Sequence, residues 1–278
     1  MILTGKAKLA GVVGWPVSHS LSPRLHGYWL QQHRIDGAYL PLPVRPEALS
    51  PVIASLAELG FRGLNVTIPH KQAVLKLCTE LDPMAERIGA VNTIVFRDGG
   101  LYGTNSDAFG FLENLYQGAP DWKPTAGPAV VLGAGGAARA VIVALLDAGT
   151  PTIHLVNRTL ARAEELAATF GDKVQPHPWD AASEAFFGAS LLVNSTSLGM
   201  TGQPDLELDL TGLPRSALVT DLVYSPLETS LLAAAKSRGN EVVDGLGMLL
   251  HQARPGFEAW FGLKPIVTED LRHFVLDV

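Results

Sequence analysis

The stretch AVVLGAGGAA, residues 129–138, decides the fold of this chain. A run of apolar residues typical of a buried strand leads into a glycine-rich turn, and a helical segment, residues 140–146, follows. In the pattern G-x-G-x-x-[G/A], Gly133 permits the tight turn, Gly135 lets a pyrophosphate approach the backbone, and small Ala138 allows close packing of helix on strand. The helix N-terminus adds an anion site. The motif predicts a dinucleotide-binding βαβ unit, and a glycine-rich turn without a ligand is the alternative.

The end of the next predicted strand, residues 153–156, indicates which dinucleotide binds. NAD-binding folds usually carry Asp or Glu there to accept a hydrogen bond from the ribose 2′-hydroxyl. This chain instead has Asn157-Arg158-Thr159, in which Arg158 can hold a 2′-phosphate with two hydrogen bonds and stack on adenine. Asn157 and Thr159 can donate to the same phosphate. The stretch favours NADP; the alternative is that Arg158 is a solvated loop cation and Thr159 a helix cap.

Short β-rich runs alternate with helical stretches along nearly the whole chain, which predicts two α/β domains. The expected strands are residues 9–14, 38–42, 63–68, 90–96, 101–103, 129–132, 153–156, 191–193 and 218–222. The expected helices run from the loop at 18–23 to about residue 33 and over 46–59, 71–77, 107–116, 140–146 and 248–261. A turn is expected at Asp98-Gly99-Gly100, and residues 118–128 carry the strongest linker signal, with three prolines and two glycines. Two such domains predict a small ligand in the cleft between them.

The composition excludes several classes of protein. With 47% hydrophobic and 17% charged residues among 278, the chain is globular and not disordered. Its net charge of −6 argues against a DNA or RNA partner. The single cysteine, Cys78, rules out an internal disulfide and suits a reducing compartment.

The sequence also lacks targeting and metal-binding signals. No apolar run is long enough to cross a bilayer, and the N-terminus lacks the features of a signal peptide. We therefore expect a soluble cytoplasmic protein without a membrane partner. The eight histidines show no spacing typical of zinc ligands, so no metal is expected.

A lysine after the third predicted strand indicates a catalytic site. In NVTIPHK, residues 65–71, Lys71 opens a predicted helix whose positive dipole end normally favours an acid. It follows the carboxyl end of a strand, where open α/β sheets bind ligands. Asn65 and Thr67 precede it at alternate positions and so point to one face. An ammonium and two hydrogen-bonding groups suit a hydroxylated substrate, whereas an exposed surface lysine is the plain alternative.

A carboxylate facing Lys71 would hold the amine in place and raise its pKa again. Asp107, in GTNSD at residues 103–107, is the candidate. An aspartate at a helix start is also ordinary capping chemistry. From the residues alone, the two interpretations of Asp107 weigh equally.

These motifs resemble the shikimate dehydrogenase family, NADP-dependent enzymes that reduce 3-dehydroshikimate to shikimate in aromatic amino-acid and chorismate biosynthesis. The likeness covers nearly the whole chain in order. It includes SHSLSP (18–23), NVTIPHK (65–71), GAVNT (89–93), residues 103–110, the glycine turn, NRT (157–159), NSTSLGM (194–200), DLVYSP (221–226) and DGLGM (244–248). So many motifs in one order are not expected by chance.

The resemblance implies a role for each matching position. Lys71 and Asp107 would be the catalytic acid/base pair. The substrate-binding residues would be Ser20, Ser22, Asn65, Thr67, Lys71, Asn92, Asp107, Tyr224 and Gln252, with the two serines and Tyr224 at the substrate carboxylate. The cofactor-binding residues would be Gly133, Ala134, Gly135, Gly136, Ala137, Asn157, Arg158, Thr159, Thr196, Leu222, Gly245 and Met248. No metal is implied.

The implied fold has a mostly parallel-sheet substrate domain and a Rossmann-type doubly wound NADP domain, with C-terminal helices returning to the first. Residues 1–106 and 247–278 would form the substrate-binding domain, and residues 107–246 the NADP-binding domain. Two departures from the family pattern are visible. Ser106 stands where the family often has Thr, and Leu222 where Met is common. Both changes are mild, and Leu222 bears on nicotinamide packing.

The expected function is therefore reversible, NADPH-dependent reduction of 3-dehydroshikimate. A quinate/shikimate dehydrogenase of the same fold is the nearest alternative, because acceptance of quinate depends on pocket detail. A non-catalytic NADP-binding sensor is a more distant alternative, whose mark would be loss of Lys71 or Asp107. The sequence does not fix the oligomeric state, and a homodimer is compatible with it.

Overall fold

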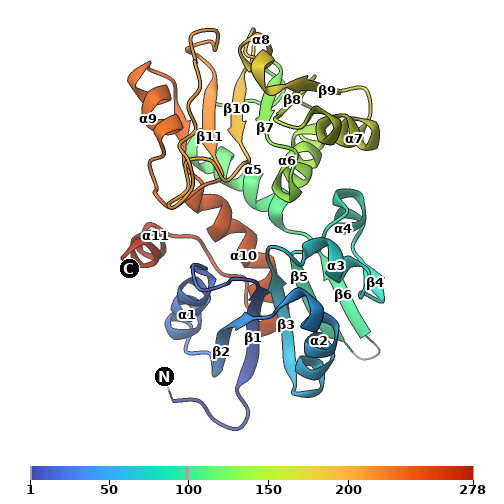
Figure 1. Cartoon of the computed structure of the whole chain (residues 1–278). Helices are drawn as coiled ribbons and strands as arrows, with labels where there is room; N and C mark the ends of the chain where they lie inside the picture. Colours follow the sequence, from blue (N-terminus) through green and yellow to red (C-terminus); the bar gives the residue numbers. More distant parts are fainter. Residues whose placement is uncertain (1, 98–99, 278) are drawn as a thin grey trace. The chain divides into compact units, whose positions relative to one another are not determined.

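The computed structural model describes residues 2–97 and 100–277. The chain divides into two compact units, one formed by Met1–Ser106 with Leu249–Val278 and the other by Asp107–Met248 (Figure 1). The linker predicted at residues 118–128 is therefore wrong as a boundary, because it lies inside the second unit. The helix before it, α5 (Asp107–Gly118), packs against a helix of that same unit, α6 (Gly136–Asp147).

A mixed six-stranded sheet forms the centre of the first unit. Its strands lie in the order β2-β1-β3-β5-β6-β4. Their bounds are β1 Lys8–Gly14, β2 Gly37–Pro43, β3 Phe61–Val66, β4 Glu80–Leu81, β5 Thr93–Arg97 and β6 Gly100–Thr104. Strands β1, β2 and β3 pair in parallel, whereas β5 pairs antiparallel with both β3 and β6. Of the turn predicted at 98–100, Asp98 and Gly99 lie outside the described residues.

Two predicted strands in this unit differ from the observed ones by two or more residues at one end or both. The third ends at Val66, so Thr67 lies beyond its carboxyl end. The strand expected from residue 90 begins at Thr93. Val91, two residues before that strand, donates its N–H to the Lys71 carbonyl at 2.9 Å instead of to a neighbouring strand. Both shifts place polar side chains just outside the sheet.

Helices of the first unit lie on the connections and at the C-terminus. They are α1 Ser22–Gln32, η1 Pro46–Ala48, α2 Leu49–Glu58, α3 Lys71–Leu75, α4 Pro83–Ile88, α10 Leu246–Phe261 and α11 Glu269–Leu276. The helix predicted over 71–77 is shorter than expected, because Leu77 donates its N–H to the Val74 carbonyl three residues back. In Figure 1 the chain returns to this unit through α10 and α11, and α11 packs against α1.

The two faces of strand β3 meet different partners. Leu64 and Val66 belong to a buried apolar cluster that also includes Ile53 of α2. Gly63, on the opposite face, leaves room for Trp260 of α10, whose indole N–H donates to the Ile94 carbonyl at 2.9 Å. Side chains alternate along a strand, so Asn65 shares the Gly63 face.

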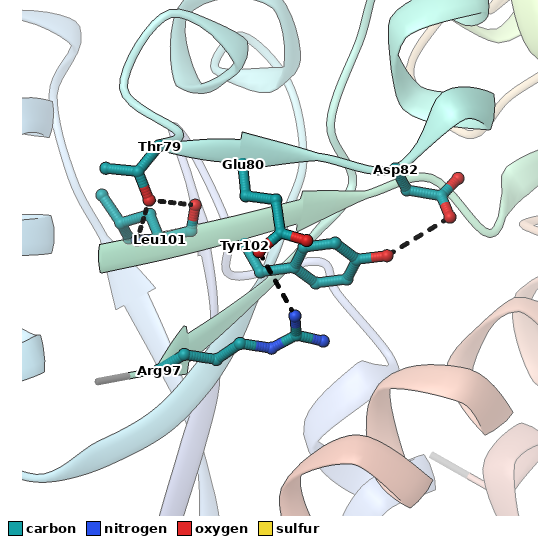
Figure 2. Close-up of polar contacts among 6 residues, drawn as sticks. All are labelled: Thr79, Glu80, Asp82, Arg97, Leu101 and Tyr102. Atoms are coloured by element: carbon teal, nitrogen blue, oxygen red, sulfur yellow. Dashed lines mark hydrogen bonds and ion pairs between the residues drawn. The ribbon is translucent and has the colours of Figure 1, made fainter. Parts of the chain in front are cut away.

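The outer edge of this sheet is held by polar contacts between β6, β4 and β5 (Figure 2). Arg97 lies 3.5 Å from the Glu80 carboxylate and 3.8 Å from the Tyr102 ring centre. The Tyr102 hydroxyl donates to Asp82 at 3.3 Å, and burial and the neighbouring Asp82 charge raise the pKa of Tyr102. Thr79 bonds both backbone groups of Leu101. These side chains fix the short edge strand β4, although exposed ion pairs add little stability.

The second unit contains a fully parallel sheet in the order β12-β11-β10-β7-β8-β9. Its strands are β7 Ala129–Leu132, β8 Ile153–Asn157, β9 Val174–Pro178, β10 Leu191–Asn194, β11 Leu218–Asp221 and β12 Val242–Val243. Besides α5 and α6, its helices are α7 Leu160–Phe170, η2 Trp179–Ala181, α8 Ala182–Ala185 and α9 Ser230–Ser237. Numbered from β7, this is the strand order of doubly wound dinucleotide-binding folds, with its switch point between β7 and β10. Among the described residues, no helix is long and apolar enough to span a membrane.

An imidazole lies within the aromatic core of the first unit. His26 of α1 is fully buried and stacks on Tyr39, with ring centres 3.9 Å apart. Phe257 and Trp260 of α10 lie within 6 Å of the same ring. Burial lowers the pKa of His26 to about 3, and the neighbouring Asn65 side chain opposes only part of that effect. The ring therefore stays neutral in the folded protein.

This buried imidazole predicts an acid-sensitive stability. Between pH 6.5 and about 3 the unfolded chain protonates His26 and the folded chain does not, so the free energy of unfolding falls as pH falls. The expected contribution is about 1.4 kcal/mol per pH unit well below pH 6.5. In His26→Phe, which keeps an aromatic ring, urea unfolding at pH 6.0, 5.0 and 4.5 should give a correspondingly shallower slope.

The exposed His33 lies just after the same helix, so His33→Phe controls for the loss of a histidine. An unchanged slope in His26→Phe would contradict the assignment of this acid sensitivity to the buried ring.

Candidate active site

Three of the predicted substrate residues meet in one hydrogen-bonded group in the first unit. The Tyr39 hydroxyl donates to Asn65 Oδ1 at 2.6 Å. Asn65 Nδ2 donates to Thr93 Oγ1 at 3.1 Å and to the Asn92 carbonyl at 3.3 Å. The Thr93 hydroxyl in turn donates to Asn92 Oδ1 at 2.9 Å. Side chains from β2, β3 and the start of β5 are thus linked.

The same group continues to helix α10 through Ser106. The Ser106 N–H donates to Asn92 Oδ1 at 3.0 Å, and its hydroxyl donates to the Gln252 carbonyl at 2.8 Å. Asn92 Nδ2 lies 3.1 Å from Ser106 Oγ and 3.4 Å from Gln252 Oε1. We call this set the amide network; its members are Tyr39, Asn65, Asn92, Thr93, Ser106 and Gln252.

The hydrogen-bond directions limit what Asn65 can offer a ligand. Both amide hydrogens are used, by Thr93 and by the Asn92 carbonyl. Burial raises the pKa of Tyr39 well above its ordinary value, so the phenol stays protonated and donates to Oδ1. A carboxamide oxygen accepts two hydrogen bonds. The remaining capacity of Asn65 is therefore to accept from a ligand hydroxyl.

The other predicted substrate residues of this unit lie on neighbouring connections. Ser22 begins α1 and is 9% exposed, and its N–H donates to Ser20 Oγ at 3.3 Å. Half-buried Thr67 follows β3 and donates its N–H to the Val13 carbonyl at 2.9 Å. The hydroxyls of Ser20 and Ser22, which lie in one turn, can bind an anionic oxygen without an arginine.

Lys71 is the first residue of α3 and is half-buried. Its carbonyl accepts from the Val91 N–H, so its backbone is tied to the residue before Asn92. The neighbouring His70 is 1% exposed, and its Nε2 lies 2.7 Å from the Val44 carbonyl oxygen. The His70 imidazole therefore points into the unit. Of these two residues, only Lys71 could contribute a titratable group to a substrate site.

The remaining two predicted substrate residues belong to the second unit. Asp107 is the first residue of α5 and is 2% exposed. It follows Ser106 directly, so the amide network fixes the backbone that precedes it. Tyr224 follows β11 and is half-buried, and burial raises its pKa, which keeps the hydroxyl protonated and able to donate.

The glycine turn of the second unit has the geometry that a pyrophosphate needs. Gly133 has φ +97°, and a Cβ there would lie 2.8 Å from Thr196 Cγ2. Gly135 and Gly136 are exposed, and a Cβ on either would meet no atom within 4 Å. Helix α6 begins at Gly136, so its N-cap, Gly135, carries no side chain that could cover the first N–H groups. Ala137 lies in its first turn. These residues fit a dinucleotide.

The turn after β8 is joined to the glycine turn. Asn157 Oδ1 accepts from the Ala134 N–H at 3.1 Å, and its Nδ2 donates to the Thr159 carbonyl at 2.7 Å. Asn157 therefore shapes both turns in addition to any phosphate contact. Arg158 and Thr159 are exposed, and Thr159 occupies the N-cap position of α7 without a capping hydrogen bond from its side chain.

A buried polar pair holds the loops after β10 and β11. Asn194 Nδ2 donates to Asp221 Oδ1 at 2.9 Å, and both residues are 0% exposed. Asn194 Oδ1 accepts from the N–H and the hydroxyl of Thr196. Asp221 also accepts from the Thr229 hydroxyl at 2.8 Å, and burial raises its pKa despite these bonds. Thr196 is thereby set beside the glycine turn.

The last three cofactor candidates lie where the chain leaves β11 and β12. Leu222 follows β11, and its N–H donates to the Asn194 carbonyl at 3.0 Å. Gly245 packs against the Leu222 carbonyl, because a Cβ on Gly245 would lie 2.5 Å from that oxygen. Met248, in the first turn of α10, is 8% exposed.

Several residues of these arrangements were missed from the sequence. In the first unit they are Tyr39, Thr93 and Ser106, although Thr93 and Ser106 lie inside motifs that had been noticed. In the second unit they are Asn194, Asp221 and Thr229.

Comparison with known proteins gives one family for both units. Residues 12–94 match the shikimate dehydrogenase substrate binding domain, and residues 123–200 match shikimate / quinate 5-dehydrogenase. A shikimate dehydrogenase (NADP(+)) of Paramagnetospirillum magneticum is 62% identical over 275 residues, covering 99% of this chain and 100% of that protein.

Solved structures agree. The shikimate 5-dehydrogenase of Thermus thermophilus in complex with NADP(H) and shikimate is 40% identical, with TM-score 0.86 over 96% of this chain and 98% of that one. The quinate dehydrogenase of Corynebacterium glutamicum in complex with NAD is 31% identical, with TM-score 0.90 over 98% and 99% of the two chains. By identity along its full length and by the motifs that build both units, the chain belongs to the shikimate dehydrogenase family.

Proposed function

We propose that this chain is an NADP-dependent oxidoreductase that reversibly reduces 3-dehydroshikimate to shikimate, a step toward chorismate and the aromatic amino acids. The observation that carries the proposal is 62% identity, along 99% of the chain, to a shikimate dehydrogenase (NADP(+)). The dinucleotide turn and the amide network support it, because they supply an anion site and a set of groups suited to a polyhydroxylated ring.

Substrate recognition is assigned to hydroxyls and amides. Ser20, Ser22 and Tyr224 bind the substrate carboxylate. The ring hydroxyls are held by Asn65, Thr67, Asn92, Asp107 and Gln252. The hydrogen bonds of Asn65 support this assignment. Both of its amide hydrogens have partners in the protein, so its remaining oxygen lone pair favours a substrate hydroxyl that donates. An analogue that lacks such a hydroxyl leaves buried groups unpaired, so this kind of site discriminates strongly.

Acid–base chemistry is assigned to Lys71 and Asp107. Bound NADPH supplies the hydride to the ketone carbon of the substrate. Negative charge then grows on the substrate oxygen, and the Lys71 ammonium donates a proton there, acting as base in the reverse direction. Asp107 orients that ammonium and accepts from a substrate hydroxyl. The presence of both residues argues against a non-catalytic NADP-binding sensor.

Cofactor binding is assigned to the second unit. The pyrophosphate is held by the turn of Gly133, Ala134, Gly135, Gly136 and Ala137. Arg158, with Asn157 and Thr159, binds the 2′-phosphate, and Thr196, Leu222, Gly245 and Met248 line the rest of the groove. Two observations support the phosphate assignment: Arg158 is exposed, and the Thr159 side chain makes no capping hydrogen bond to α7.

We further propose a cytoplasmic enzyme with a small-molecule substrate and without nucleic-acid or membrane partners, and a homodimer is compatible with these assignments. Burial raises the pKa of the single cysteine, Cys78, to about 11, so the thiol is unreactive and suits a reducing compartment.

Quinate/shikimate dehydrogenase is the second candidate, because the second unit matches a family named for both substrates. Dinucleotide reduction should be measured with shikimate and with quinate, each with NADP⁺ and NAD⁺. The proposed function expects the highest kcat/KM for shikimate with NADP⁺. Equal or better turnover of quinate would favour the second candidate, and no turnover of either would overturn both.

Replacing Lys71 by Ala should remove most of kcat, about 10²–10⁴-fold, with little change in the KM for shikimate, because the ammonium acts mainly in the transition state. Lys76→Ala, at an exposed position just after α3, is the matched control and should keep normal turnover. Near-normal kcat in Lys71→Ala would refute the assignment.

Replacing Arg158 by Asp should raise the KM for NADPH and shift preference toward NADH, because a carboxylate repels a 2′-phosphate and accepts from a 2′-hydroxyl. Lys173→Asp makes the same charge change at an exposed position of the same unit and should leave both KM values alone. An unchanged KM for NADPH in Arg158→Asp would count against the phosphate assignment.

A further inference from the structure

Two buried hydroxyls flank Asn92, and neither has a place in the proposed substrate contacts. Thr93 is 1% exposed and Ser106 is 4% exposed, while Asn92 between them is 3% exposed. The three residues come from two chain segments, at the start of β5 and at the end of the loop after β6. Both hydroxyls bond the Asn92 side chain.

Thr93 links Asn92 to Asn65. Its oxygen accepts from Asn65 Nδ2 at 3.1 Å, and its single hydrogen goes to Asn92 Oδ1 at 2.9 Å. The hydroxyl therefore uses one lone pair to accept from Asn65 and its only hydrogen to donate to Asn92. This bond requires the carbonyl end of the Asn92 amide to face Thr93.

Ser106 fixes the other end of the same amide. The hydroxyl has one hydrogen, and its shortest acceptor is the Gln252 carbonyl at 2.8 Å. Its oxygen is therefore available to accept from Asn92 Nδ2 at 3.1 Å. The Ser106 N–H meets Asn92 Oδ1 at 3.0 Å. Exchanging the oxygen and nitrogen of the Asn92 amide would set the Ser106 N–H against Nδ2 and lose the bond that the Thr93 hydroxyl donates to Oδ1.

We propose that Thr93 and Ser106 are positioning residues for the substrate site, which rests on the proposed function. Between them they fix which end of the Asn92 amide faces which way, and through Thr93 and Asn92 they set the side chains of Asn65 and Gln252. Neither hydroxyl needs to touch the substrate. The departure from the family's usual Thr at position 106 is harmless on this account, because Ser and Thr carry the same hydroxyl.

Removing one hydroxyl leaves the buried Asn92 amide short of one hydrogen-bond partner, so its orientation is held less strongly. The KM for shikimate should then rise about tenfold in Thr93→Val, which keeps the shape of the side chain, and in Ser106→Ala. The KM for NADP⁺ should change by less than about twofold, because the second unit binds the cofactor. Thr93→Ser and Ser106→Thr retain the hydroxyls and should restore shikimate binding.

The double variant Thr93→Val/Ser106→Ala gives a further test, since both hydroxyls act through one amide. Its loss should be smaller than the product of the two single losses. Titration calorimetry with shikimate should show the same order as KM. Ser55→Ala is the matched control, because that exposed hydroxyl also donates to a carbonyl, that of Pro51 at 2.9 Å, away from the amide network.

Thermal unfolding separates positioning from folding. If Thr93→Val fails to fold, Ser106→Ala in its loop decides the outcome together with the two conservative variants. If the wild-type enzyme is active on shikimate and the folded Ser106→Ala variant keeps the wild-type KM for shikimate, the inference is overturned. The proposed function is not affected by that result. Equal rises in the KM for both substrates overturn the inference too, because that result marks a general structural loss. A wild-type protein without activity on shikimate overturns the proposed function, and the inference falls with it.

Discussion

The requirement that a buried amide keep all its hydrogen bonds shapes the candidate site more than any other constraint. Asn92 is almost completely buried, and an unpaired amide at that depth costs about 1–3 kcal/mol. Its partners come from β5, from the loop that ends at Ser106 and from α10, which are distant in the sequence. Forming the hydrogen bonds of the Asn92 side chain therefore requires these three segments to lie next to one another. The surface they form is rigid because no member can move without leaving another unpaired.

The second unit uses the same device at its own strand ends. Asn194, the fully buried last residue of β10, bonds Asp221 and both the N–H and the hydroxyl of Thr196. Asn157, the last residue of β8, accepts from the Ala134 N–H of the glycine turn. In each unit a buried or half-buried asparagine at a strand end holds the adjoining loop: Asn92 just before β5, and Asn157 and Asn194 at the ends of β8 and β10. Asparagine suits this position because its amide offers a donor and an acceptor to backbone groups and carries no charge to desolvate.

The sequence predicted those features that depend on neighbouring residues. The glycine turn, its strand and its helix could be recognised because strand, turn and helix lie within twenty residues and each has a local physical signature. The amide network could not, since it joins Tyr39 to Gln252 through contacts that no periodicity encodes. The strand β4 and the helix α8, with two and four residues, are too short to give a pattern. The prediction of a domain linker at residues 118–128 failed for a related reason. Prolines and glycines mark a loop, but they do not indicate whether that loop lies between two units or within one.

The length of α3 changes the reason for giving Lys71 a special place. A lysine opposed to a helix dipole was the first signal, yet this helix has only five residues, and its dipole is correspondingly small. What distinguishes Lys71 is instead its backbone, whose carbonyl accepts from the N–H of Val91. The next residue is Asn92, so the base of the lysine side chain is set by the segment that the amide network holds. For the proton transfer that we propose for Lys71, this backbone position is therefore a better argument than the helix dipole.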